Sequence, residues 1–282
     1  MSVRKPVYAV IAAVLLALPA AADDASWGGP GWVRLGSRPA AEDLRCAGYA
    51  RSGNRWVVST AAGGIAVSAQ SSADTVDPLP FSVSRHRERL GARHVLPVDD
   101  GWLVGYDGGE FGGALWWFSG DGSRSYRAGP SGKPLEAVSL PVQGFVRFAG
   151  RHLVFRGLDH LTLRAGAAFS IQKSGGRWRL VLFAQLDGQA LAWLVRDSRL
   201  MVLTFSGIWS VDGVGAVRPE VRFGEDWPWP TSLAADQSSL YVGLPRYVLE
   251  LSAGPSGWSE IWHVQRECQR AQVVELDCRC LP

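Results

Sequence analysis

The chain is poor in several residue types that mark particular classes of protein. Its 282 residues include only 3 Lys, 2 Met, 4 Cys and a single Asn, Asn54. Charged residues make up 20% of the chain and hydrophobic residues 47%, so the composition is not that of a disordered or charge-driven protein. Gly (33 residues) and Trp (13 residues) are abundant instead, which indicates a packed body with many turns.

Long apolar runs are also missing. No segment approaches the roughly 18 consecutive apolar residues that a membrane-spanning helix needs. The apolar stretch 9–21 follows Arg4 and Lys5 and ends in small residues. This pattern predicts a secretory signal peptide over residues 1–22. We therefore expect a periplasmic or secreted protein without a membrane span. Residues 23–282 should form a single domain, because no linker divides them.

The chain has no strong excess of charge of one sign. It has 29 Lys and Arg against 26 Asp and Glu, and loss of Arg4 and Lys5 with the signal peptide would leave 27 against 26. Nucleic-acid binding needs a basic stripe, so no nucleic-acid partner is expected. The basic cluster 85–94 is expected to be a solvated loop or short helix. Arg87 within it is a candidate contact for a partner.

The four cysteines are divided unequally along the chain. Cys46 lies near the mature start, whereas Cys268, Cys278 and Cys280 lie near the end. An even number of cysteines in an exported chain predicts two disulfides. We expect one bridge from Cys46 to the C-terminal group and one within that group, although spacing alone does not decide the connectivity. Cys278 and Cys280 would also suit a metal, but a disulfide is the favoured interpretation and no metal site is predicted.

Short apolar segments recur at intervals of about 40 to 50 residues, a period typical of β-propellers. Each follows a turn signal of Gly, Asp or Ser and precedes another β-rich run. The segments are Arg55–Ser59, Gly101–Gly105, Arg151–Phe155, Arg199–Leu203 and Ser239–Gly243.

In this period and strand texture the chain resembles the β-propeller superfamily over nearly the whole mature length. The resemblance implies an all-β fold with five four-stranded blades, or six if residues 79–98 contain a degenerate unit. A large β-sandwich and a non-propeller barrel are the alternatives. Neither Trp-Asp blade endings nor kelch Gly pairs repeat. Calcium-dependent propeller hydrolases that resemble gluconolactonase use Asn at their metal, and a single Asn argues against that family.

Catalytic signatures are absent. The stretch 129–133 lacks the spacing and the following helix of a phosphate-binding loop. There is no Gly-x-Ser-x-Gly elbow and no pair of His at zinc spacing. The sequence therefore favours a non-catalytic protein, and we expect no cofactor.

The strongest local feature is a carboxylate between two Gly pairs in the stretch 108–113. The glycines would let a tight turn present Glu110 and Phe111 at the surface. Asp107 beside Glu110 would form the kind of carboxylate pair that glycosidases use, and these two residues are the catalytic candidates. A salt bridge or a turn cap is the favoured interpretation of Glu110.

A second candidate is the stretch Trp227-Pro228-Trp229-Pro230. The prolines stiffen the loop, and the Trp rings could stack on a sugar or anchor a partner. Packing between blades is an equally open interpretation. Asp159 and His160 are neighbours on a strand and should point to opposite faces, so we expect them to be turn and surface residues.

These patterns favour an exported, non-catalytic binding module that recognises a protein partner in the cell envelope through loops on one face. An inhibitor or immunity protein and an assembly scaffold are concrete versions. The alternative is a carbohydrate-active enzyme or lectin that uses Asp107, Glu110 and Trp platforms facing one pocket. The candidate binding residues are Glu110, Phe111, Trp227, Trp229 and Arg87.

Overall fold

The computed structural model describes residues 31–49, 55–62, 64–70, 79–84, 86–129, 140–224, 226–255 and 257–266. The predicted signal peptide and Cys268, Cys278 and Cys280 lie outside these residues. Cys46 is part of the helix α1 (Ala41–Tyr49), but its side chain lies outside the described part. The two disulfides therefore stay a prediction.

Most of the described chain is folded into antiparallel meanders of four strands, which confirms the all-β class. The first meander comprises β4 (Ala92–Val98), β5 (Gly101–Asp107), β6 (Leu115–Ser119) and β7 (Ser125–Ala128). The second comprises β8 (Val142–Phe148), β9 (Arg151–His160), β10 (Leu163–Ser174) and β11 (Arg177–Leu186). The third comprises β12 (Ala192–Arg196), β13 (Arg199–Thr204), β14 (Gly207–Val211) and β15 (Val217–Arg222).

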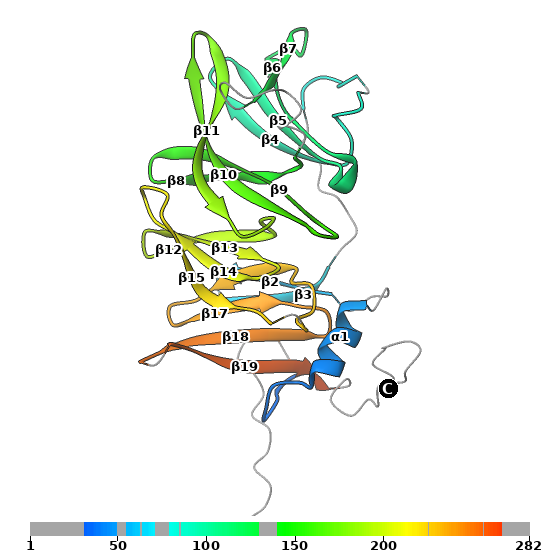
Figure 1. Cartoon of the computed structure of the whole chain (residues 1–282), viewed down its shortest axis with the longest axis vertical. Helices are drawn as coiled ribbons and strands as arrows, with labels where there is room; N and C mark the ends of the chain where they lie inside the picture. Colours follow the sequence, from blue (N-terminus) through cyan, green and yellow to red (C-terminus); the bar gives the residue numbers. More distant parts are fainter. Residues whose placement is uncertain are drawn as a thin grey trace, which may run out of the picture.

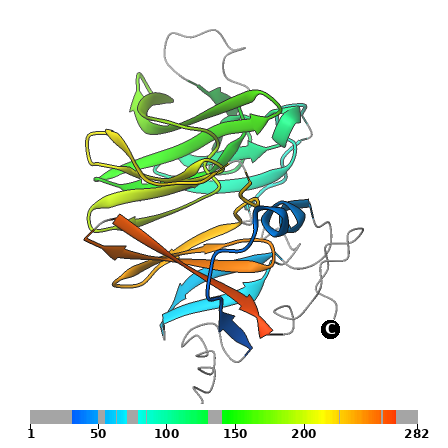
Figure 2. The ribbon, with the colours of Figure 1, turned by 60° about the horizontal axis from the view of Figure 1, so that its bottom comes forward.

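The fourth meander is joined by a strand from the other end of the chain. It comprises β16 (Ser232–Ala235), β17 (Ser239–Gly243), β18 (Tyr247–Gly254) and β19 (Gly257–Gln265). The strand β1 (Trp32–Arg34) pairs antiparallel with β19 (Figure 2). The hairpin of β2 (Trp56–Ala61) and β3 (Gly64–Ala69) packs against β16 and β17. Four of the five predicted repeat segments are thus the second strands of the meanders, β5, β9, β13 and β17, and the remaining one lies on β2.

The sheets follow one another along the long axis of the molecule, from β4–β7 through β8–β11 and β12–β15 to β16–β19 (Figure 1). First strands of neighbouring sheets contact one another, as β4 does with β8 and β12 with β16. The described residues form no closed propeller, and the unit of β2 and β3 has two described strands where four were expected.

One face of the first sheet is covered by an irregular segment instead of by another sheet. The Phe81 ring centroid lies 5.5 Å from that of Phe118, and the guanidinium of Arg89 lies 3.9 Å from the ring centroid of Trp116. A neighbouring blade would cover this face in a closed ring. Residues 79–98 therefore provide no sixth blade among the described residues: their first part is irregular and their second part is β4.

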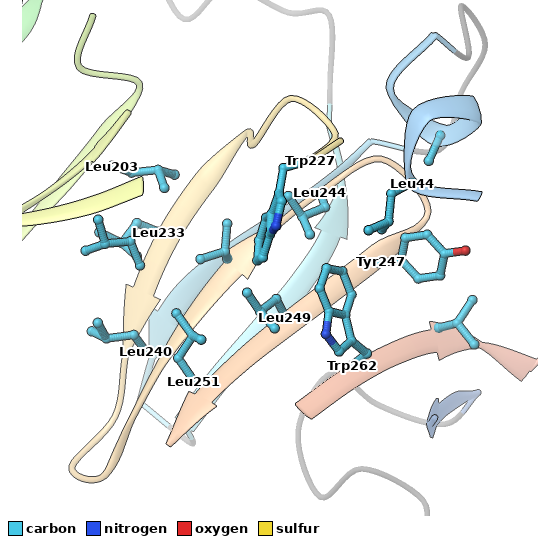
Figure 3. Close-up of a cluster of buried hydrophobic side chains, with 14 of the residues drawn as sticks. Leu44, Leu203, Trp227, Leu233, Leu240, Leu244, Tyr247, Leu249, Leu251 and Trp262 are labelled. Carbon is cyan, nitrogen blue, oxygen red and sulfur yellow. The ribbon is translucent and has the colours of Figure 1, made fainter. Parts of the chain in front are cut away.

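Alternating apolar residues of the third and fourth sheets enclose a hydrophobic cluster with Trp262 near its centre (Figure 3). Leu249 and Leu251 lie two positions apart on β18, so both point into the cluster. Leu44 of α1 closes one end. Burial of each such side chain stabilises the fold by about 1.5 to 3 kcal/mol. No helix in the described part of the chain has the length and apolar character to cross a membrane.

Candidate binding site

Loops from three consecutive sheets meet on one side of the molecule. Connections in an antiparallel meander alternate between the two ends of its sheet. The β5–β6, β9–β10 and β13–β14 connections therefore emerge at the same end as the connections between sheets. Residues of these loops line one cavity of about 630 Å³. Its apolar lining includes Leu158, Leu191, Phe205, Phe223 and Trp227, and its polar lining consists of Glu110, Asp159, His160, Arg164, Gln189 and Ser206.

Trp227 is a packing residue in the wall of this cavity. Its ring stacks on Phe223 with centroids 4.0 Å apart and an interplanar angle of 8°. The Trp262 ring lies 5.2 Å away, and the guanidinium of Arg38 lies 5.1 Å from the Trp227 ring. Only 8% of Trp227 is exposed, so little of it is open to a ligand.

Trp229 differs from Trp227 although it is two residues away. It is 57% exposed, and its described ring contact is an edge contact with Phe205 at 5.5 Å. Pro228 and Pro230 on either side of it are buried. The two interpretations of the Trp-Pro-Trp-Pro stretch thus each apply to one ring: Trp227 packs, and Trp229 is free to contact a partner.

Glu110 forms an ion pair across the mouth of the cavity. It lies on the 3-10 turn η1 (Gly109–Phe111), and its Oε2 is 3.1 Å from Nε2 of His160 at the end of β9. Both side chains are nearly half exposed, so the pair is accessible from solvent. Glu110 thus has a side-chain partner, and the contact is a salt bridge when His160 is protonated.

Asp107 does not join Glu110 in the cavity lining. Its Oδ1 accepts a hydrogen bond of 2.9 Å from the backbone N–H of Gly109, which caps the turn that carries Glu110. The structure therefore assigns Asp107 a local structural contact, and the second carboxyl group of the cavity lining, beside Glu110, is that of Asp159 and not that of Asp107.

Asp159 and His160 both line the cavity; His160 is exposed, in agreement with the expected surface position, whereas Asp159 is half-buried. The backbone N–H of Gln189 donates to Oδ2 of Asp159 at 3.2 Å, and the backbone N–H of Asp159 donates to Oε1 of Gln189 at 3.4 Å. This reciprocal contact fastens the β9–β10 hairpin to the β11–β12 connection. Burial raises the pKa of Asp159 above its usual value.

Three large exposed apolar side chains line the cavity, and a fourth, Phe111, lies next to the lining residue Glu110 on the turn η1. Leu161 is 92% exposed, Phe111 79%, Trp229 57% and Leu163 49%. We call these four residues the rim. Arg87 is also exposed, but it lies in the segment over the first sheet and not in the cavity lining.

Sequence reasoning missed several residues of this site. Phe205, Ser206 and Gln189 carry no motif, and they reach the cavity because three sheets turn their loops to the same side. Among the described residues, no group of three or more His, Cys, Asp and Glu side chains could hold a metal ion. No protein-family model matches this chain, and no curated protein sequence does.

Proposed function

We propose that this chain is an exported binding module that recognises a protein partner in the cell envelope through the rim and the cavity. The clustering of the rim carries the proposal. Nine large hydrophobic side chains of the described residues are exposed; three of them, Leu161, Leu163 and Trp229, line this one cavity, and a fourth, Phe111, follows the lining residue Glu110 in the chain. Contiguous exposed apolar surface around a hollow is typical of interaction sites, because it is unfavourable in water until a partner covers it.

A five-bladed propeller remains the proposed architecture of the whole chain. Three features support it: the repeat of four-stranded meanders, the additional β2–β3 hairpin, and the sharing of one sheet by β1 and β19. An inhibitor or immunity protein and an assembly scaffold are the two kinds of binding module that fit such a protein.

Site-specific photo-crosslinking in intact cells tests the proposed function. With p-benzoylphenylalanine at Leu161 we expect one discrete protein adduct, identified by mass spectrometry. The matched control is Val214, which is 85% exposed on the β14–β15 turn at the opposite end of its sheet. Equal adducts at both positions, or no adduct from the crosslinker at either Leu161 or Phe111, would contradict the proposal.

Glycan binding is a second candidate, favoured by the free ring of Trp229 beside planar polar side chains. Glu110, Arg164 and Gln189 offer both donors and acceptors to hydroxyl groups, while an indole face suits the C–H face of a sugar ring. A glycan array that includes peptidoglycan fragments tests it. Binding that Trp229→Ala reduces at least tenfold would support a lectin, whereas turnover lost in Glu110→Gln would indicate an enzyme.

A further inference from the structure

The tip of the β9–β10 hairpin has an unusual residue at a strained position. His160 pairs with Leu163, so Leu161 and Thr162 form a two-residue turn. Leu161 has φ = 52°, in the left-handed region that glycine tolerates best. When the first central residue of a two-residue turn has positive φ, that residue is usually glycine. Leucine at this position is therefore locally unfavourable.

The other described two-residue hairpin turns with positive φ use small or turn-favouring residues, whereas the longer β17–β18 connection has the buried Arg246 at φ = 66°. The β8–β9 turn has Ala149 and Gly150, and the β12–β13 turn has Asp197 and Ser198. The β10–β11 turn has a pair of glycines. Leu161 thus combines two unfavourable properties, a large side chain at positive φ and almost complete exposure to water. Neither property contributes to the stability of the free protein.

The surroundings of Leu161 indicate what kind of surface it meets. Leu163 is also exposed and lines the same cavity, so the apolar area is broader than one side chain. Glu110 and Asp159 contribute carboxyl groups to the cavity lining that also contains Leu161. The basic side chains of this lining are Arg164 and His160. Carboxylates at this position disfavour an anionic lipid surface and favour neutral or basic groups on a partner.

We propose that Leu161 is the principal anchor of the interface and inserts into an apolar hollow on a partner protein whose adjacent groups facing Glu110 are neutral or basic. This inference rests on the proposed function. It adds that the leucine is kept at an unfavourable backbone position because binding requires it, so affinity and stability oppose each other at this residue.

The test compares Leu161→Gly with Ala149→Gly. Ala149 is the matched control, since it occupies the same first central position, at φ = 47°, in the β8–β9 hairpin at the opposite end of the sheet. Both substitutions should raise the melting temperature by about 1 to 3 °C, because glycine relieves the positive φ. The adduct formed from p-benzoylphenylalanine at Phe111 should fall at least tenfold with Leu161→Gly and stay unchanged with Ala149→Gly.

The outcomes separate this inference from the proposed function. If Leu161→Gly keeps the Phe111 adduct, Leu161 is not the anchor, and the proposed function stands. If Leu161→Gly lowers the melting temperature, leucine is not unfavourable for stability at this position, and the inferred conflict between stability and binding does not exist. If the unsubstituted rim forms no adduct at Phe111 or Leu161, the proposed function fails as well.

A vesicle-binding experiment tests whether Leu161 contacts a lipid surface instead of a protein partner. Unsubstituted protein should stay in solution when it is sedimented with phosphatidylglycerol vesicles. Sedimentation of this protein with the vesicles, lost in Leu161→Gly, would show that the hairpin inserts into lipid and would overturn the assignment to a protein partner.

Discussion

At the scale of single residues, aspartate side chains act here mainly as turn caps. Asp236 accepts backbone hydrogen bonds from Ser238 and Ser239 at 2.8 and 2.7 Å, and Asp212 accepts them from Val214 and Ala216 at 3.0 and 2.9 Å. Asp107 makes the same kind of contact with Gly109. This shared role explains why Asp107 was not found beside Glu110 in the cavity. Its position before a Gly-rich turn predicts a cap at least as well as a catalytic group.

The capping role of Asp107 predicts a difference between two substitutions. Asp107→Asn should leave the free energy of unfolding within about 0.5 kcal/mol of the original value, because Asn also caps such turns. Asp107→Ala should lower it by about 1 kcal/mol, because the N–H of Gly109 loses its acceptor. Urea denaturation followed by Trp fluorescence measures both. A large loss with Asp107→Asn would show that the negative charge itself is required.

At the scale of elements, close approach between strands of different sheets holds the row of meanders together. A Cβ atom at Gly144 of β8 would lie 2.6 Å from the Trp193 ring of β12, and 3.7 Å from Nδ1 of His94 on β4. The Trp193 ring in turn lies 4.4 Å from that of Phe155 on β9. Strands of three sheets therefore meet where a glycine leaves room for an aromatic ring.

Filling this space should destabilise the protein. Gly144→Ala meets the Trp193 ring and also forces alanine to adopt φ = 152°, so we expect a loss of about 2 to 4 kcal/mol. Gly150→Ala is the control: its φ is 72°, but an added Cβ would find nothing within 4 Å, and we expect a loss of about 1 kcal/mol. Equal losses in thermal or urea unfolding would mean that the contact between sheets is unimportant.

At the scale of the whole molecule, carboxylates that accept several hydrogen bonds connect the stability of the fold to pH. Asp100 accepts hydrogen bonds from the indole N–H groups of Trp117 and Trp178, at 3.0 and 2.9 Å, and pairs with Lys173 at 3.0 Å. These residues belong to the first and second sheets, so the cluster ties two meanders together. Burial alone would raise the pKa of Asp100, but the donors of Trp178, Lys173 and Trp117 outweigh burial and lower it.

The sign of the pH effect follows from these lowered values. The pKa values of Asp100 and Asp236 lie below their usual value in the fold, and hydrogen bonds from Ser119 and Ser123 lower the pKa of Asp121 to about 2. A lowered pKa stabilises the fold above the unfolded value of about 4, and this contribution is lost as the pH falls through the folded pKa. The raised pKa of Asp159 acts in the opposite sense and offsets part of this stabilisation.

We therefore predict little change in stability between pH 7 and pH 5 and a steep loss below about pH 4. Asp100→Asn should lower the free energy of unfolding at pH 7 by at most about 1 kcal/mol, because Lys173 loses one of its two carboxylate partners and keeps Asp99, while an amide oxygen remains for the indoles. The same substitution should also make the loss of unfolding free energy below about pH 4 less steep. Urea unfolding at several pH values measures the free energy of unfolding. If its decrease below about pH 4 is the same in Asp100→Asn and in the unsubstituted protein, Asp100 does not contribute to the pH dependence.

What the sequence determined by itself was local. Strand positions, turns and their period of about 40 to 50 residues follow from side-chain alternation and from Gly, Asp and Ser at the turns, which depend on neighbours in the chain. For the same reason the meanders could be predicted. The exposed presentation of Glu110 and Phe111 on a Gly-rich turn was likewise predictable from local sequence.

Only the tertiary structure decided which loops share a cavity, that Trp227 packs while Trp229 is free, and that His160 pairs with Glu110. These outcomes depend on residues of different sheets, far apart in sequence, whose contacts leave no periodic signal. The irregular segment over the first sheet and the absence of a closed ring among the described residues have the same origin. Sheets pack through whichever apolar face is left uncovered, and chain position alone does not specify which segment covers it.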